Sequence, residues 1–122
     1  RVVGVVSRHA TTYADSLAAG RVVEAEVSTR LADGMAVRRA DPAALAVLAA
    51  GLDHLVQVGD DEVAAAMRAL YHDTHNLAEG AGAAALAGAL QERAALRGQQ
   101  VAVVLTGANV DAALMAEVLR NP

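Results

Sequence analysis

The chain has 122 residues, 55% of them hydrophobic, and its ten basic and fourteen acidic side chains leave a formal net charge of −4. A chain of this length can bury a core as one domain. It lacks the clustered basic charge that binds nucleic acid, so we expect no DNA or RNA partner. The longest small-apolar stretch, 80–90, is about half of the ~20 residues that span a bilayer, so we expect no membrane segment.

Two residue types are missing from the composition. The chain has no cysteine, which excludes disulfides, cysteine zinc sites and thiol nucleophiles. All ten basic residues are arginines, so no lysine is available to form a Schiff base or to act as a general base. Arg1 leads directly into an apolar run without a signal-peptide pattern, and we expect a cytoplasmic protein.

The chain alternates apolar runs typical of strands with segments of helical periodicity. In chain order, the patterns predict a strand over Val2–Val6, helices over Thr11–Ala19 and Asp41–Gly51, a strand over Leu55–Val58, helices over Asp60–His75 and Glu79–Leu96, a strand over Val101–Leu105 and a last helix over Asp111–Leu119. The stretch Val22–Val37 mixes alternation with a turn signal and stays ambiguous. Val101–Leu105 is the clearest strand, because an uninterrupted apolar run lies between turn residues.

Three helix ends carry specific signals. Gly20 is expected to stop the first helix. Asp41 is the expected N-cap of the second helix, with Pro42 at its first position, where a missing N–H costs nothing. The acidic residues 60–62 lie where the next helix presents the positive end of its dipole.

Strands that alternate with helices, without a hairpin signal between them, favour parallel pairing. We therefore predict an α/β fold, a layered parallel sheet flanked by helices, with residues 1–122 forming a single α/β unit. Ligands of such folds bind at the carboxyl ends of the strands. That rule selects the loop Thr106–Asn109 and, by extension, Gly59 and Asp60.

Local patterns at the candidate sites leave alternatives open. The hydroxyl of Thr106, on a turn with a permissive glycine, suits a ligand's polar atom, but an ordinary strand-to-helix turn explains it equally well. The segment 79–85 superficially matches a dinucleotide fingerprint, but it follows a polar stretch instead of a strand. Close approach of this helix to another backbone or to a flat ligand is the better interpretation of its small residues. His72 and His75 are spaced i, i+3 near a helix end without a metalloprotease-type signature, so we expect no metal site.

Four motifs in a fixed order carry a resemblance to a known family. They are Leu31–Val37 (LADGMAV), Val58–Val63 (VGDDEV), Ala78–Ala85 (AEGAGAAA) and Val103–Asp111 (VVLTGANVD). Together they resemble the C-terminal part of threonine dehydratases, which are fold-type II enzymes that depend on pyridoxal 5'-phosphate (PLP). The resemblance covers essentially the whole chain and about the last third of the family's catalytic region. It implies that this unit is a C-terminal fragment of a catalytic domain within the larger fold-type II fold.

The resemblance implies roles for individual residues. Thr106 matches the family's Ser, Thr or Cys that hydrogen-bonds the pyridine nitrogen of PLP, with Gly107 and Asn109 shaping the loop under the ring. Glu79 matches a glutamate close to cofactor and substrate. Asp33 and Gly34 match a loop that borders the substrate site.

The sequence also departs from parts of the family. Val6 and Thr12 stand where a metal-activated branch, the serine racemases, places carboxylates, and neither can replace such a ligand for a hard cation. The resemblance places the lysine that carries PLP, and the glycine-rich phosphate loop, upstream of Arg1. We therefore expect no catalytic residue in this chain and no covalent attachment of PLP to it.

The resemblance implies an L-threonine, and also L-serine, ammonia-lyase that makes 2-oxobutanoate and ammonia from threonine by PLP-dependent β-elimination. The parent is expected to be a homo-oligomer, and the chain alone to be inactive. Two alternatives stay open: a non-catalytic binding or assembly module with this fold, and a related serine or 3-hydroxyaspartate dehydratase.

Overall fold

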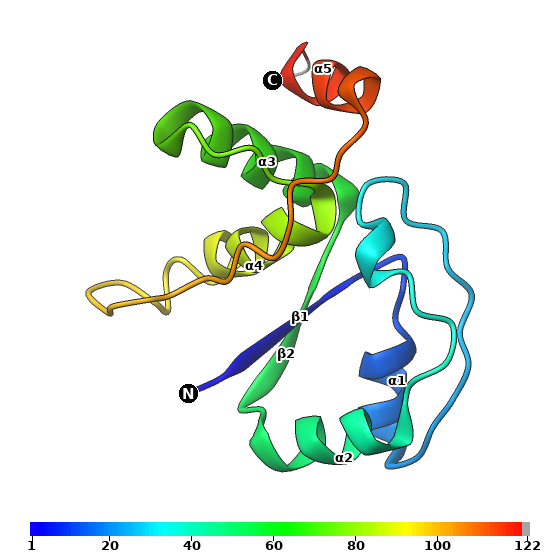
Figure 1. Ribbon diagram of the computed structural model, residues 1–122. Coiled ribbons are helices and arrows are strands. Elements are labelled where there is room, and N and C mark those ends of the chain that lie inside the picture. The colour runs from blue at the N-terminus through cyan, green and yellow to red at the C-terminus, as the bar shows by residue number, and fades with distance from the viewer. Residues whose placement is uncertain (121–122) are drawn as a thin grey trace.

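The computed structural model describes residues 1–120 as two strands flanked by helices (Figure 1). In chain order the elements are β1 (Val3–Ser7), α1 (Thr12–Ala19), the short 3-10 helix η1 (Asp33–Met35), α2 (Pro42–Gly51), β2 (His54–Val58), α3 (Asp60–Thr74), α4 (Gly80–Gln91) and α5 (Ala112–Arg120). None of the helices in residues 1–120 is long and apolar enough to cross a membrane.

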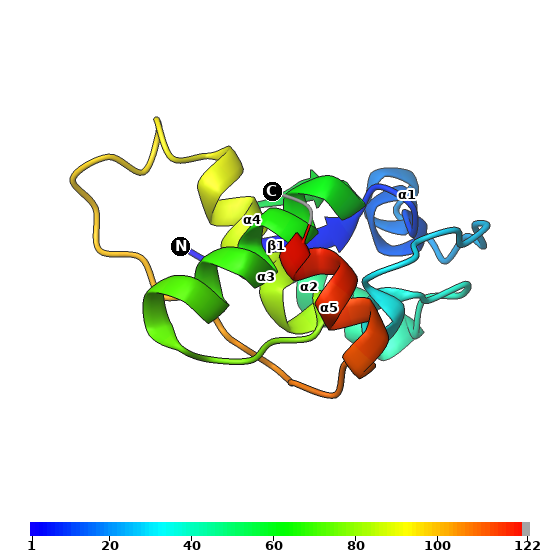
Figure 2. The ribbon, with the colours of Figure 1, turned by 90° about the horizontal axis from the view of Figure 1, so that it is seen from above.

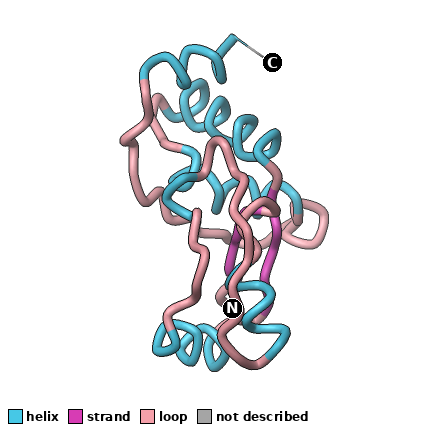
Figure 3. The backbone as a smooth tube through the Cα atoms, turned by 90° about the vertical axis from the view of Figure 1, so that its right-hand side faces the viewer, coloured by secondary structure: helices cyan, strands magenta, loops and turns pink. Residues whose placement is uncertain are grey.

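The strands β1 and β2 pair in parallel, as predicted. Their register runs from Val3 opposite His54 to Ser7 opposite Val58, and the chain between them passes through α1, η1 and α2. Figure 3 shows the paired strands side by side, with helices above and below them. Parallel strands need such a long connection, because a tight turn can only reverse the chain. The α/β prediction is confirmed.

The main core lies between the sheet and the pair α3 and α4. Val58, Val63 and Met67 are fully buried there. Helix α4 lies so close to β1 that a Cβ on Gly88 would come within 2.7 Å of a methyl group of Val5. The other side of the sheet faces α1 and α2 (Figure 1). The small residues of α4 therefore serve close packing, as the sequence indicated.

Local signals placed several helix ends correctly. Gly20 closes α1 in the left-handed region, with φ of 64°. The carboxylate of Asp41 accepts a hydrogen bond of 2.8 Å from the Ala44 N–H, at the start of α2. In α5, which begins at Ala112, Asp111 accepts from the Ala113 N–H. Each device satisfies a backbone group that the helix end leaves free.

The predicted strand Val101–Leu105 is wrong. Residues 101–105 have no regular secondary structure, and Val104 is 70% exposed. No backbone–backbone hydrogen bond involves residues 100–106 in the described chain. A strand forms only beside another strand, and this segment runs past α4 toward α5, away from β1 and β2 (Figure 1).

The predicted helix Glu79–Leu96 is also too long. Helix α4 ends at Gln91, and residues 92–98 form turns that loop out beyond it (Figure 2). Apart from Glu92 and Leu96, which are half-buried, these residues are exposed, so little packing favours a continued helix. Gly98 takes a left-handed conformation in the turn, with φ of 78°.

A histidine joins the start of β2 to the end of α4. His54 Nδ1 lies 2.8 Å from Asp53, and its Nε2 lies 2.8 Å from Glu92. Only the protonated imidazole can donate to both carboxylates at once. The hydrogen bond to Asp53, followed by the one to Glu92, raises the pKa of His54 above its ordinary value. The hydrogen bond from His54 lowers the pKa of Asp53, and Arg1, which lies 3.3 Å from that carboxylate, acts in the same direction.

We predict that this contact makes stability depend on pH. A raised histidine pKa stabilises the fold below the ordinary value of 6.5, and this contribution is lost as pH rises through the folded value. The lowered Asp53 pKa stabilises above 3.8, and its contribution is lost as pH falls through the folded value. In urea unfolding, the free energy of unfolding of wild type should exceed that of H54Q most between pH 3.8 and 6.5. The difference should shrink at pH 9. The exposed His72→Gln is the control; a pH-independent difference for H54Q would contradict the assignment.

Candidate functional site

Two loops that are far apart in sequence, residues 106–109 and residues 31–34, meet at the start of α4. Glu79 is the residue before the helix, and its N–H donates a 3.1 Å hydrogen bond to the carbonyl oxygen of Gly107. The carbonyl oxygen of Glu79 accepts from Ala83 N–H at 2.9 Å, the first hydrogen bond of the helix. Glu79 thus joins the 106–109 loop to α4 through its backbone.

Missing side chains allow the 106–109 loop to approach so closely. A Cβ on Gly82 would overlap the carbonyl oxygen of Gly107, and a Cβ on Gly107 would overlap the carboxylate of Glu79. Glycine is needed at position 82 because backbone occupies the space of a side chain there, whereas at Gly107 the space is taken by the end of the Glu79 side chain. The sequence singled out these glycines, but their role depends on a contact across about a fifth of the chain.

The second loop contacts the same helical turn through Gly80. A Cβ there would overlap the carbonyl oxygen of Leu31, and a Cβ on Gly34 would lie 3.0 Å from that of Ala81. Successive helix residues are rotated by about 100°, so Gly80 and Gly82 face nearly opposite sides of α4. The two loops therefore flank the first turn of the helix on either side.

This arrangement brings together the residues that the sequence selected. Glu79 contacts Gly107 directly, and Gly34 lies against Ala81, two residues after Glu79. The 106–109 loop carries the exposed residues Thr106 and Asn109, and the 31–34 loop carries the exposed Asp33. Glu79 is half-buried. The site therefore offers a neutral hydroxyl, an amide and two carboxylates, and none of these residues is basic.

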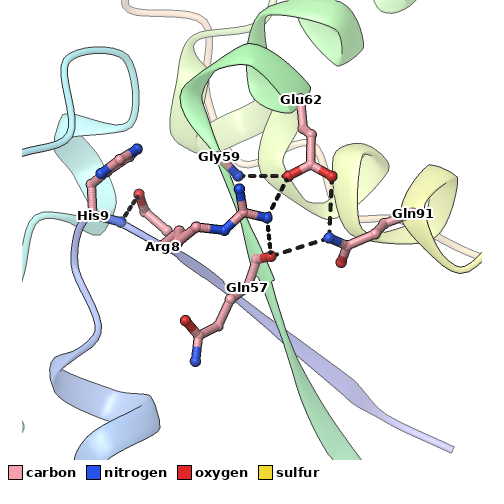
Figure 4. A network of polar contacts seen from close by, with 7 residues as sticks. Arg8, His9, Gln57, Gly59, Glu62 and Gln91 are labelled. Atoms are coloured by element: carbon pink, nitrogen blue, oxygen red, sulfur yellow. Dashed lines mark hydrogen bonds and ion pairs between the residues drawn. The ribbon is translucent and has the colours of Figure 1, made fainter.

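The second predicted ligand loop, at Gly59 and Asp60, is already occupied by protein groups. The Glu62 carboxylate accepts from the Gly59 N–H at 2.7 Å and pairs with Arg8 at 3.1 Å (Figure 4). Gln91 donates to Glu62 at 3.1 Å and to the carbonyl oxygen of Gln57. This cluster joins the ends of both strands to α3 and α4. Its only sequence signal was the run of acidic residues 60–62 at the start of α3.

The predicted absence of metal ligands stays a prediction. His72 and His75 are both exposed near the end of α3, and His75 has left-handed backbone with φ of 57°. Over residues 1–120, no three His, Asp or Glu side chains are grouped as a metal site. Thr12 is fully buried, and its hydroxyl has no hydrogen-bond partner within that range.

A family model described as pyridoxal-phosphate dependent enzyme matches residues 1–107. The chain belongs to this family. The chain is also 34% identical over 121 residues to the L-threonine ammonia-lyase of Geobacter sulfurreducens, and 35% identical over 123 residues to a putative threonine dehydratase of Sinorhizobium fredii.

Solved structures of this PLP-dependent family agree with the fold. The processed form of threonine deaminase isoform 2 from Solanum lycopersicum superposes with a TM-score of 0.91 at 28% identity, over 98% of this chain and 34% of that one. The two curated relatives are matched over 99% of this chain but over only 30% and 37% of their own length. The resemblance to fold-type II threonine dehydratases is confirmed, and the chain spans about a third of these relatives.

We predict that the contact at Gly80 is sensitive to a single methyl group. G80A should destabilise the chain by about 1–3 kcal/mol, because the Leu31 backbone must move to admit the methyl group. The matched control is G51A, at a helix residue where an added Cβ meets nothing within 4 Å. G51A should be neutral or stabilising by up to about 1 kcal/mol. Equal effects of the two variants in urea unfolding would show that the loop does not lie on Gly80.

Proposed function

We propose that this chain supplies one wall of the PLP site in an L-threonine dehydratase. The observation that carries the proposal is the meeting of the 106–109 loop and the 31–34 loop on one turn of α4. Family membership supports the cofactor, and the names of the relatives support threonine as substrate. L-serine would be a second substrate of the same PLP-dependent β-elimination.

The residues present suit the ring end of PLP and not its phosphate. The Thr106 hydroxyl is exposed and can donate to or accept from a pyridine nitrogen. The two carboxylates of the site, on Glu79 and Asp33, would repel a phosphate. Thr106 and the loop residues Gly107 and Asn109 would therefore hold the ring, and the phosphate would be bound by groups outside this chain.

When bound, PLP supplies an electron sink for the negative charge that forms when the substrate loses its α-proton. The Thr106 hydroxyl is neutral and does not stabilise a proton on the pyridine nitrogen as a carboxylate would. The sink is therefore weak, which favours prompt loss of the β-hydroxyl over long-lived negative charge. The backbone hydrogen bond from the Glu79 N–H to the Gly107 carbonyl oxygen fixes the loop that carries Thr106.

The elimination needs a base and a covalent anchor that this chain does not contain. PLP is attached covalently to its enzymes through the side-chain amine of a lysine, and the sequence has no lysine. The isolated chain is therefore inactive under this proposal. The part of the relatives outside the matched third would have to supply the lysine.

A chimera tests the proposal directly. The 122-residue chain would replace the matching region of the Geobacter sulfurreducens L-threonine ammonia-lyase, which is 30% of that protein. The chimera should make 2-oxobutanoate from L-threonine, and the chain alone with PLP should make none. T106V in the chimera should lower turnover by about tenfold or more because the hydrogen bond is lost, whereas T106S should retain most of it.

Three outcomes would contradict the proposal. Production of 2-oxobutanoate by the isolated chain would show that the base lies within it. A chimera that binds PLP, seen in its absorption spectrum, but makes no product would exclude this chain as a competent wall of the site. Equal activity of T106V and T106S would remove the role of the hydroxyl.

A further inference from the structure

We propose that Asp60 is a positioning residue that holds the 29–34 loop against α4 and so sets the substrate-side edge of the site. The role of that edge rests on the proposed function; the anchoring itself does not. Asp60 is the first residue of α3 and lies in sequence about thirty residues beyond the loop it holds. Its aspartate neighbour in sequence, Asp61, is exposed.

Both carboxylate oxygens of Asp60 accept hydrogen bonds from the loop. The Thr29 hydroxyl donates to Oδ1 at 2.7 Å, and the Arg30 backbone N–H donates to Oδ2 at 2.8 Å. Bonds to an ionised acceptor are shorter and about twice as strong as neutral ones. The positive end of the α3 dipole stabilises negative charge at this position. Asp60 therefore fixes two consecutive loop residues from one side.

Thr29 passes this constraint on to the contact with α4. Its hydroxyl oxygen accepts from the Ala32 N–H at 3.1 Å, and Ala32 is fully buried. The Leu31 carbonyl, in the peptide before Ala32, lies on Gly80 of α4. The Ala32 carbonyl then accepts from the Met35 N–H at 2.9 Å, which closes the turn that contains Asp33 and Gly34.

No other polar group within residues 1–120 shares this task. The hydrogen bonds that join residues 29–37 to the rest of the described chain all end on Asp60, and the others are internal to that stretch. The surrounding stretch has little regular structure, with isolated bridges at Ala10–Val27 and Glu24–Arg39. Glu62, in the same helix turn as Asp60, already binds Gly59, Arg8 and Gln91. Removing the Asp60 carboxylate should therefore release the loop while leaving the sheet intact.

Amide hydrogen exchange on the full 122-residue chain tests the anchor without any activity. In D60N the Arg30 and Ala32 amides should exchange at least about tenfold faster, as expected from loss of a charge-assisted hydrogen bond. D61N removes the same charge from the same helix turn and should leave both amides unchanged. The β-strand amides of Val6 and Val56 should stay protected in both variants, which shows that the fold is retained. Equal exchange of Arg30 and Ala32 in D60N and D61N would overturn the anchor.

Thr29 provides a conservative test of the relay. T29S keeps the hydroxyl and should keep the Ala32 amide protected, whereas T29V should expose it. If Ala32 exchanges equally in both variants, the relay through Thr29 is wrong. A merely structural effect of the substitutions would not follow the presence of the hydroxyl.

Kinetics of the chimera test the consequence for the site. D60N should raise KM for L-threonine about tenfold, with kcat changed by less than about threefold, because the loop borders bound substrate and does not react. D61N should leave both constants unchanged. If the amides of D60N are released but its KM equals that of D61N, the loop does not border the substrate. That result would overturn the substrate-side role and leave the anchor standing.

Discussion

The first turn of α4 supports the candidate site because two of its residues lack side chains. Gly80 admits the Leu31 carbonyl on one side, and Gly82 admits the Gly107 carbonyl on the other. Each approach fills the volume of a methyl group with backbone, which no other residue type allows without a shift. The loops, and the side chains that they present, depend on these two contacts for their placement.

Carboxylates then fix what the glycines admit. Asp60 and Glu62 lie in the same turn of α3, where the helix dipole favours negative charge. Asp60 binds the 29–34 loop, and Glu62 joins the ends of both strands to α4 through Arg8 and Gln91. Two acidic residues of one helix turn thus have separate tasks, although their sequence signal was only that of a charged helix start.

Local rules predicted the features that depend on neighbouring residues. The Asp41 cap and the Gly20 stop follow from turn chemistry within a few residues, and the parallel pairing follows from the alternation of strands with helices along the chain. The segment Val101–Leu105 has the composition of a strand, but a strand also requires a neighbour, and composition carries no information about one. Likewise, the ordered motifs selected Glu79 and Gly107, whereas the contacts of Asp60 with Thr29 join distant segments and had no local pattern.

The central claim is that both loops lie on α4 at the same time. Nuclear Overhauser effects in the 122-residue chain test it most directly, because they report hydrogens in close contact. The account predicts cross-peaks from Gly80 to Leu31 or Ala32 together with cross-peaks from Gly82 to Gly107. The absence of either set, with the contacts of α4 to β1 preserved, would contradict a site built on this turn.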